Sequence, residues 1–230
     1  TLRVVVTGTN GGGSAAATSS AMTGNPGAPA NTGLPTISGT TRDTQTLTAS
    51  NGTWTGTAPL TYTYQWQRCN AAGASCVDIA GSTAQTRTLT SADVGSTMRV
   101  RVTATNVAAS VQATSAQSAV VVADPPVNTA VPTITGTARD TQTLTSAVGT
   151  WTGTATITYA RQWQRCNAAG ASCADIVGAT GTTYTLTPSD VGSTIRVRVT
   201  GTNAGGSSAA NSVVTAVVAP DPPVNTVLPV

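Results

Sequence analysis

One stretch of sequence occurs twice in this chain, and no other feature constrains the fold as strongly. The run YTYQWQRCNAAGASCVDI begins at Tyr62, and YARQWQRCNAAGASCADI begins at Tyr159, so the two copies are 97 positions apart. The chain is therefore a tandem repeat. A period of this length is typical of single domains, which commonly contain about 100 residues. A chain of 230 residues thus has room for two complete domains.

The composition favours strands over helices. All 11 basic residues are Arg and all 8 acidic residues are Asp, and the chain contains no Lys, Glu, His or Phe. Thr, Ala, Ser, Gly and Val fill most of the other positions. Because β-branched Thr and Val disfavour helices and suit pleated strands, we expect an all-β protein.

The charge and hydropathy patterns argue against two classes of partner. The net charge of +3 comes from scattered arginines without a run of like charges, which argues against nucleic acid. The longest apolar patch, Ala119–Ala123, is far shorter than the roughly 20 residues of a membrane helix, so no membrane insertion is expected within this segment. The first residues, TLRVVVTGTN, lack the layout of a signal peptide, and we expect any export signal to lie outside this sequence.

The four cysteines form two close pairs, Cys69 with Cys76 and Cys166 with Cys173. We predict two disulfides, each linking the two strands of one hairpin, and hence an oxidising, extracellular or cell-surface location. Each ring this small contributes roughly 2 to 3 kcal/mol on the chain-entropy model. Free thiols or a zinc site are the alternatives, but paired zinc ligands are usually closer in sequence and the chain has no His.

Strand alternation predicts where these cysteines lie. From Thr61 to Cys69 one face carries Tyr62, Tyr64 and Trp66, which we place inward. Cys69 then belongs to the other face. We therefore expect a disulfide on the surface of the domain rather than one that joins two sheets.

Repeated sequence also predicts the domain boundaries. TLRVVVTGTN at the N-terminus matches TMRVRVTATN from Thr97, so residues 1–25 are predicted to be the C-terminal strands of a truncated module. Residues 26–123 and 124–220 are predicted to be complete modules, and 221–230 the first strand of a following one. The segments VADPPVN, from Val122, and APDPPVN, from Ala219, lie at the junctions between predicted modules. Their paired prolines predict stiff linkers.

Each copy contains about seven short strand patterns separated by turn residues, which is typical of an immunoglobulin-like β-sandwich. A Trp in the third strand and the Asp-x-Gly turns at Asp93 and Asp190 agree with this fold class, tandem immunoglobulin-like modules of about 97 residues. The inter-sheet cysteine pair of antibody domains is missing, so apolar residues must fill its place. The predicted core residues are Leu47, Trp66, Val100, Val102, Leu144, Trp163, Val197 and Val199.

Three motifs, PTISGTTRDTQTLTASNGTWTG, YQWQRC and LTSADVGSTMRVRVTATN, together resemble bacterial immunoglobulin-like repeats that form tandem arrays in secreted and cell-surface proteins. The resemblance covers nearly the whole chain. It implies a structural stalk or filament segment, including an adhesive fibre body, whose partners are copies of itself or neighbouring modules. It implies no cofactor, metal or shared active site.

One polar surface is a candidate contact face. Its residues alternate with the predicted core and are Gln65, Gln67, Arg99, Arg101, Gln162, Gln164, Arg196 and Arg198. Such a face could bind a surface glycan or a neighbouring subunit, although polar sheet faces are more often only solvated. Trp54 and Trp151 could stack on sugar rings if exposed, but packing is the commoner role.

Two function classes therefore remain. Without His, Lys or Glu the chain has few groups for acid–base catalysis, so we expect no enzyme. A structural stalk or filament is the first hypothesis. The alternative is a carbohydrate- or cell-wall-binding accessory module of a larger secreted protein. Exposure of Trp54 or Tyr62 beside the polar face would favour binding, and burial of both would favour the scaffold.

Overall fold

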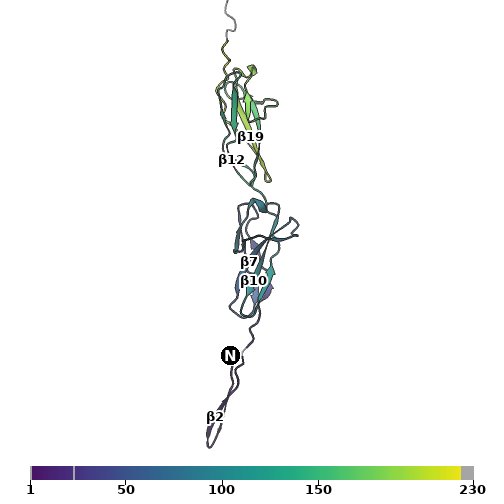
Figure 1. Ribbon diagram of the computed structural model, residues 1–230, viewed down its shortest axis with the longest axis vertical. Helices are drawn as coiled ribbons and strands as arrows, with labels where there is room; N and C mark the ends of the chain where they lie inside the picture. Colours follow the sequence, from purple (N-terminus) through teal and green to yellow (C-terminus); the bar gives the residue numbers. More distant parts are fainter. Residues whose placement is uncertain (1, 23, 224–230) are drawn as a thin grey trace, which may run out of the picture. The chain divides into compact units, whose positions relative to one another are not determined.

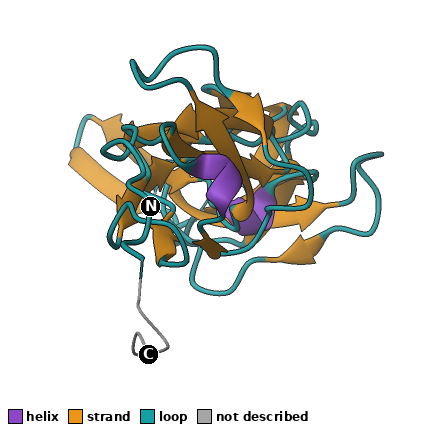
Figure 2. Ribbon diagram, turned by 90° about the horizontal axis from the view of Figure 1, so that it is seen from above, coloured by secondary structure: helices purple, strands orange, loops and turns teal. Residues whose placement is uncertain are grey.

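The computed structural model describes residues 2–22 and 24–223, and its named strands all pair antiparallel. Besides strands and loops it has two single turns of 3-10 helix, η1 (Ser91–Asp93) and η2 (Pro188–Asp190). Figure 2 shows strands throughout, with these short helical turns among them. The predicted all-β class is confirmed. The predicted strand at 221–230 falls mostly outside the described residues.

The strands repeat in the same order as the sequence. An N-terminal hairpin contains β1 (Val5–Asn10) and β2 (Gly13–Thr18). The next strands are β3 (Ala30–Gly33), β4 (Ile37–Ser38), β5 (Thr46–Ala49), β6 (Thr53–Thr55), β7 (Thr61–Cys69), β8 (Val77–Asp78), β9 (Thr86–Thr88), β10 (Thr97–Thr105) and β11 (Ser110–Thr114). The second set is β12 (Val127–Ala130), β13 (Thr133–Thr135), β14 (Thr143–Ala147), β15 (Thr150–Thr152), β16 (Thr158–Cys166), β17 (Ala174–Asp175), β18 (Thr183–Thr185), β19 (Thr194–Asn203) and β20 (Gly206–Asn211).

The chain divides into two compact units. The first comprises Thr1–Thr41, Gln45–Thr88 and Ser96–Val120, and the second comprises Arg42–Thr44, Leu89–Gly95 and Val121–Val230. The first unit thus holds β1 to β11, and the second holds β12 to β20 with both 3-10 turns. Because two short segments of the first sequence copy group with the second unit, the predicted module boundaries stay a prediction.

The first unit is organised around the long pair β7 and β10 (Figure 1). They form the centre of a four-stranded sheet in the order β11-β10-β7-β8, while β4-β5-β9 form a second sheet and β3 pairs with β6. In register, Val100 lies opposite Trp66 and Val102 opposite Tyr64. The alternating sequence of β10 sends Met98, Val100 and Val102 into the interior, where all three are fully buried.

The second unit repeats this arrangement. Its sheets are β17-β16-β19-β20 and β13-β14-β18, with β12 paired to β15. Leu144 of the second sheet packs in one buried cluster with Trp163, Val197 and Val199 of the first. Two antiparallel sheets therefore face each other across a shared apolar core, which is an immunoglobulin-like β-sandwich.

All eight residues predicted for the core are fully buried in the structure. The two tryptophans also satisfy their polar atom. Trp66 Nε1 donates to the Ala84 carbonyl oxygen at 2.9 Å, and Trp163 Nε1 donates to Gly181 at 2.9 Å. Each indole therefore reaches from the four-stranded sheet to the loop that leads into the other sheet. Because its N–H group has an acceptor, each indole ring is buried without leaving an unpaired donor.

Both predicted disulfides are present, linking Cys69 to Cys76 and Cys166 to Cys173, each with Cα atoms 3.9 Å apart. The expected surface position is wrong for one cysteine of each pair, because Cys69 and Cys166 are only 2% exposed. The reason is that Cys69 is still paired with buried Thr97 at the end of β10. Face alternation alone could not show this cover at the strand end.

The N-terminal hairpin differs from every other element. β1 and β2 pair with each other, and within residues 2–22 and 24–223 they join no further strand (Figure 1). All residues of both strands are exposed. These residues belong to the segment predicted to be the end of a truncated module.

Candidate functional site

The predicted contact face in the first unit is a hydrogen-bonded set of side chains on the four-stranded sheet. Gln67 lies opposite Asp78 in the β7–β8 register, and its Nε2 donates to Asp78 Oδ1 at 2.7 Å. Arg101, two strands away from β8, donates from a terminal guanidinium nitrogen to Asp78 Oδ2 at 2.8 Å. Arg99 lies opposite Gln67 in the β7–β10 register and is half-buried. Asp78 is therefore the shared acceptor of this face.

The second unit builds the same set with one additional contact. Gln164 Nε2 donates to Asp175 Oδ1 at 2.6 Å, and Arg196 Nε donates to Gln164 Oε1 at 2.6 Å. Arg198, which is exposed, lies 3.8 Å from an Asp175 oxygen. Gln164 is buried rather than exposed, because partners on both sides cover it. Gln164, Asp175 and Arg196 therefore satisfy one another, whereas in the first unit the Nε atom of Arg99 is buried without a hydrogen-bond partner among the described residues.

The remaining two predicted contact residues are tied to the backbone. Gln65 Nε2 donates to the Ile79 carbonyl oxygen at 2.8 Å, and Gln162 Nε2 donates to Ile176 at 2.8 Å. Both glutamines are half-buried. Their amide groups connect β7 and β16 to the chain that follows the disulfide loops. Both amides are thus engaged inside their own unit.

Asp78 is kept ionised by its neighbours. The hydrogen bond from Gln67 lowers the pKa of Asp78 most, and the hydrogen bond and charge of Arg101 lower it further, against a rise from desolvation. Because the carboxylate is ionised at neutral pH and already accepts two hydrogen bonds, it is poorly suited to act as a general acid or base.

The two tryptophans considered for sugar binding are half-buried and packed. Trp54 Nε1 donates to the Asn51 carbonyl oxygen at 2.7 Å, and the Trp54 ring lies 6.4 Å from that of Tyr62. Trp151 lies against the backbone of Gly201, where a Cβ would come within 3.2 Å of the ring. Packing is therefore the main role of both rings.

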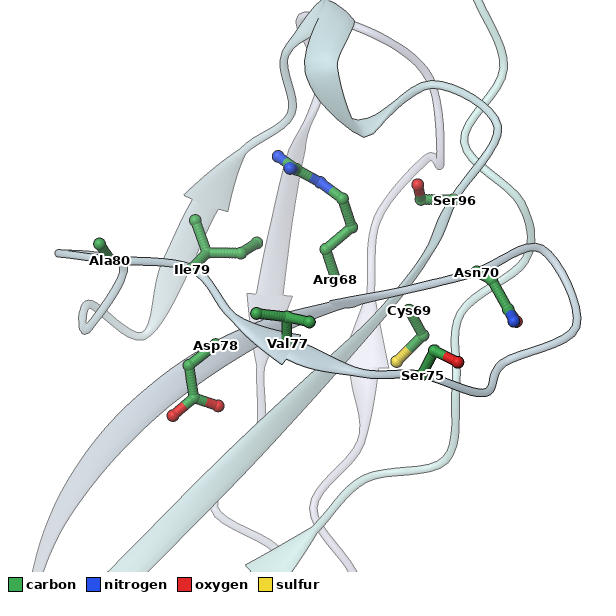
Figure 3. Close-up of a pocket in the computed structure, with 9 residues that line it drawn as sticks. All are labelled: Arg68, Cys69, Asn70, Ser75, Val77, Asp78, Ile79, Ala80 and Ser96. Carbon is green, nitrogen blue, oxygen red and sulfur yellow. The ribbon is translucent and has the colours of Figure 1, made fainter.

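A hollow of about 440 Å³ lies beside the first disulfide (Figure 3). Its lining residues are Arg68, Cys69, Asn70, Ser75, Val77, Asp78, Ile79, Ala80 and Ser96. Figure 3 shows the Asp78 carboxylate and the Arg68 guanidinium pointing to opposite sides of the strand. The two ionisable residues of the hollow do not converge on a common point, so it lacks the arrangement that catalysis or anion binding requires.

A buried carboxylate, which the sequence reading treated only as part of a turn, is the strongest electrostatic feature of the second unit. Asp190 is fully buried and accepts hydrogen bonds from Arg165 Nε at 2.7 Å and from the Tyr184 hydroxyl at 2.9 Å. It also accepts the Thr187 backbone N–H at 2.8 Å and the Thr187 hydroxyl at 2.9 Å. The Thr-x-x-Asp spacing is a capping-box signal that could have predicted the last two contacts.

These contacts set the charge state of the buried group. Burial raises the pKa of Asp190, but the hydrogen bonds from Thr187, Arg165 and Tyr184 together outweigh it, so the pKa is lowered. Burial, followed by the hydrogen bond to Asp190, raises the pKa of Tyr184. Asp190 is therefore an ionised acceptor that links Arg165, Tyr184 and the turn at Thr187. Its role is structural.

Among the described residues no group of three or more Cys or Asp side chains could hold a metal ion. Within residues 2–22 and 24–223 no helix is long and apolar enough to cross a membrane.

Comparison with known proteins gives no family. No protein-family model matches the chain, and no curated protein matches it. Among solved structures, the chain resembles titin domains A168–A170, with 18% identity, 92% of this chain and 72% of that chain covered, and a TM-score of 0.30. It also resembles the four N-terminal immunoglobulin domains of Dscam1 isoform 9.44, with 10% identity, 85% of this chain and 46% of that chain covered, and a TM-score of 0.32. These scores are low, and the fold assignment rests on the strand order and core described above.

Proposed function

We propose that this chain is a structural segment of an extracellular stalk or filament made of tandem immunoglobulin-like repeats on a bacterial surface, and that the fibre body can serve adhesion. The observation that carries the proposal is that both units use their polar face for internal hydrogen bonds. Asp78 and Asp175 occupy equivalent positions and accept from equivalent glutamines. What both copies share is a set of contacts that tie the strands of the four-stranded sheet to one another, and this favours a scaffold.

The disulfides support a mechanical role. Each closes a loop with a sequence separation of 7 and holds its Cα atoms 3.9 Å apart. Fully extended, such a loop would span roughly 24 Å. The stretched chain is therefore shorter by roughly 20 Å for each intact disulfide. Disulfides are also typical of proteins outside the reducing cytosol, which supports an extracellular location.

Single-molecule stretching tests the proposal. The 230-residue chain is pulled between its ends with intact disulfides and then in reductant. We expect two sandwich-unfolding events, with each length increment growing by roughly 20 Å after reduction. The double variant Cys69→Ala with Cys76→Ala is the matched control, because it should show the longer increment in one event only. Unfolding at negligible force in every event would contradict a mechanical role.

A carbohydrate-binding accessory module is the second candidate. It is favoured by Tyr159, which is 37% exposed and whose ring lies 5.9 Å from that of Trp151. Titration with cell-wall polysaccharide tests this candidate, with Tyr159→Ala as the variant and Tyr184→Phe as a control away from the aromatic pair. Binding that is lost in Tyr159→Ala and kept in the control would favour the accessory module over the scaffold.

A further inference from the structure

The N-terminal hairpin has the strand register of a complete domain. In β1–β2, Val6 lies opposite Ala17, as Val199 lies opposite Ala210 in β19–β20. The pair Val102 and Ala113 in β10–β11 is equivalent. The hairpin therefore already has the conformation that the last two strands adopt in both sandwiches.

A side-chain hydrogen bond next to the hairpin repeats as well. The Val4 backbone N–H donates to Ser19 Oγ at 2.9 Å. The Val197 N–H donates in the same way to Ser212 Oγ at 3.0 Å, and the Val100 N–H donates to Ser115 Oγ at 3.1 Å. The three hairpins share both the strand register and this hydrogen bond, so they are structurally equivalent.

The N-terminal hairpin differs from the other two in the burial of its apolar side chains. Leu2, Val4 and Val6 are 81%, 64% and 65% exposed. Their counterparts in β19, which begin with Ile195, are fully buried. Three large apolar side chains on one face thus lack the cover that the same face has elsewhere in this chain. Contiguous exposed apolar residues of this kind mark interaction surfaces.

The structure shows what covers the equivalent face in the second unit. β19 pairs along its other edge with β16, where Val197 lies opposite Trp163 and Val199 opposite Arg161. The facing sheet contributes Leu144 to the same cluster. A partner for the hairpin must therefore supply both a strand with the sequence pattern of β16 and the sheet that packs over it.

A second folded copy of these sandwiches cannot be that partner. The edge of β7 that a β1-type strand would join is already paired along its whole length with β10, and the same edge of β16 is paired with β19. β1 therefore cannot take its equivalent place in either folded sandwich. The partner must be a repeat unit that lacks its own last two strands.

We propose that the apolar face of β1–β2 is the docking surface for the front part of a further repeat unit, of the sequence type of residues 26–96, joined directly ahead of Thr1. Direct linkage is favoured because in both copies the β7-type strand and the closing hairpin belong to one continuous chain, β7 ending at Cys69 and β10 beginning at Thr97. This partner of the hairpin does not depend on the stalk role, since a carbohydrate-binding array would be completed in the same way.

An extended chain tests the proposal. A second copy of residues 26–96 is placed ahead of Thr1 in the full 230-residue protein, and amide hydrogen exchange is followed in residues 4–18. We expect exchange there to slow by on the order of 100-fold relative to the unextended chain, toward the rates of the equivalent amides in β19–β20, because ordered strands exchange only by opening. Unchanged exchange, both with this extension and with the second one described below, would overturn the proposal.

Two matched variants show which face docks. Val4 points to the proposed interface, whereas Val5 occupies the position that is Arg101 and Arg198 in the other hairpins. In the extended chain, Val4→Arg should abolish the protection and Val5→Arg should leave it intact. Equal effects of the two substitutions would contradict the proposed surface.

A second extension guards against a folding failure that is peculiar to one sequence. It carries residues 124–193, which directly precede the equivalent hairpin in the second copy. Protection of the hairpin by either extension supports the proposal, and failure of both overturns it. The stretching experiment on the unextended chain remains independent, so failure of this inference and failure of the proposed function are distinguishable.

Discussion

Removal of the Asp190 carboxylate should destabilise the second unit more than removal of any of its single partners. Asp190→Ala leaves the Arg165 guanidinium, the Tyr184 hydroxyl and the Thr187 N–H without the acceptor that they share. Breaking a buried ion pair by deleting one partner costs about 3 to 5 kcal/mol. Because Arg165 is 35% exposed and can recover water, we expect the lower end, about 3 kcal/mol.

The assay is thermal unfolding monitored by a probe in the second unit. For a domain of this size, about 3 kcal/mol corresponds to a fall in Tm of roughly 12 to 24 °C. Tyr184→Phe is the matched control, because it removes one hydrogen bond and should cost about 1 kcal/mol. A Tm for Asp190→Ala within a few degrees of the Tyr184→Phe value would refute the claim that the buried carboxylate organises this region.

The same group predicts a pH dependence with a definite sign. The folded-state pKa of Asp190 lies below its ordinary value of 3.8, so ionised Asp190 contributes stability above that pH. The contribution is lost as the pH falls through the folded-state pKa. The difference in unfolding free energy between the natural chain and Asp190→Asn should therefore be constant near neutral pH and shrink below about pH 4. A difference that grows on acidification would contradict the assigned sign.

Three other predictions concern the core, the polar face and the disulfides. Trp163→Ala should cost about 3 to 5 kcal/mol of unfolding free energy, because it empties a fully buried site, and denaturant titration measures the loss. Gln67→Ala should raise the pKa of Asp78 toward its ordinary value, since Gln67 is the main cause of its lowering, and NMR titration of the Asp78 carboxyl checks this; no rise would mean that Arg101 alone sets the value. Reduction of the Cys69–Cys76 disulfide should lengthen one unfolding increment by roughly 20 Å in force spectroscopy, and an unchanged increment would contradict a disulfide-closed loop in this unit.

Local pattern predicted much of this fold. The alternation in β10 was sufficient to place Val100 and Val102 in the core, because a strand with one buried face has a period of two. The repeat itself predicted that Leu144 and Trp163 would be buried in the core of the second copy, as their counterparts are in the first. The equal spacing of the cysteines likewise predicted the two disulfides.

Features that depend on contacts distant in sequence were not predictable in this way. Cys69 is buried by its pairing with Thr97, which alternation along one strand cannot show. Asp190 gathers Arg165 from β16 and Tyr184 from β18, and the local spacing reveals only its contacts with Thr187. The polar face was predicted as a surface, but its internal hydrogen bonds follow from the register of separate strands.

The scaffold proposal leads to a simple expectation for the native material. If tandem sandwiches of this kind are joined by short proline linkers, each unit should add about 30 to 40 Å along a fibre, given strands of about eight residues that rise roughly 3.3 Å each. Electron microscopy of unreduced native material measures this axial repeat directly. The account predicts a continuous filament with one bead per roughly 30 to 40 Å. Isolated short particles that do not join into a filament would contradict the account and would favour carbohydrate binding instead.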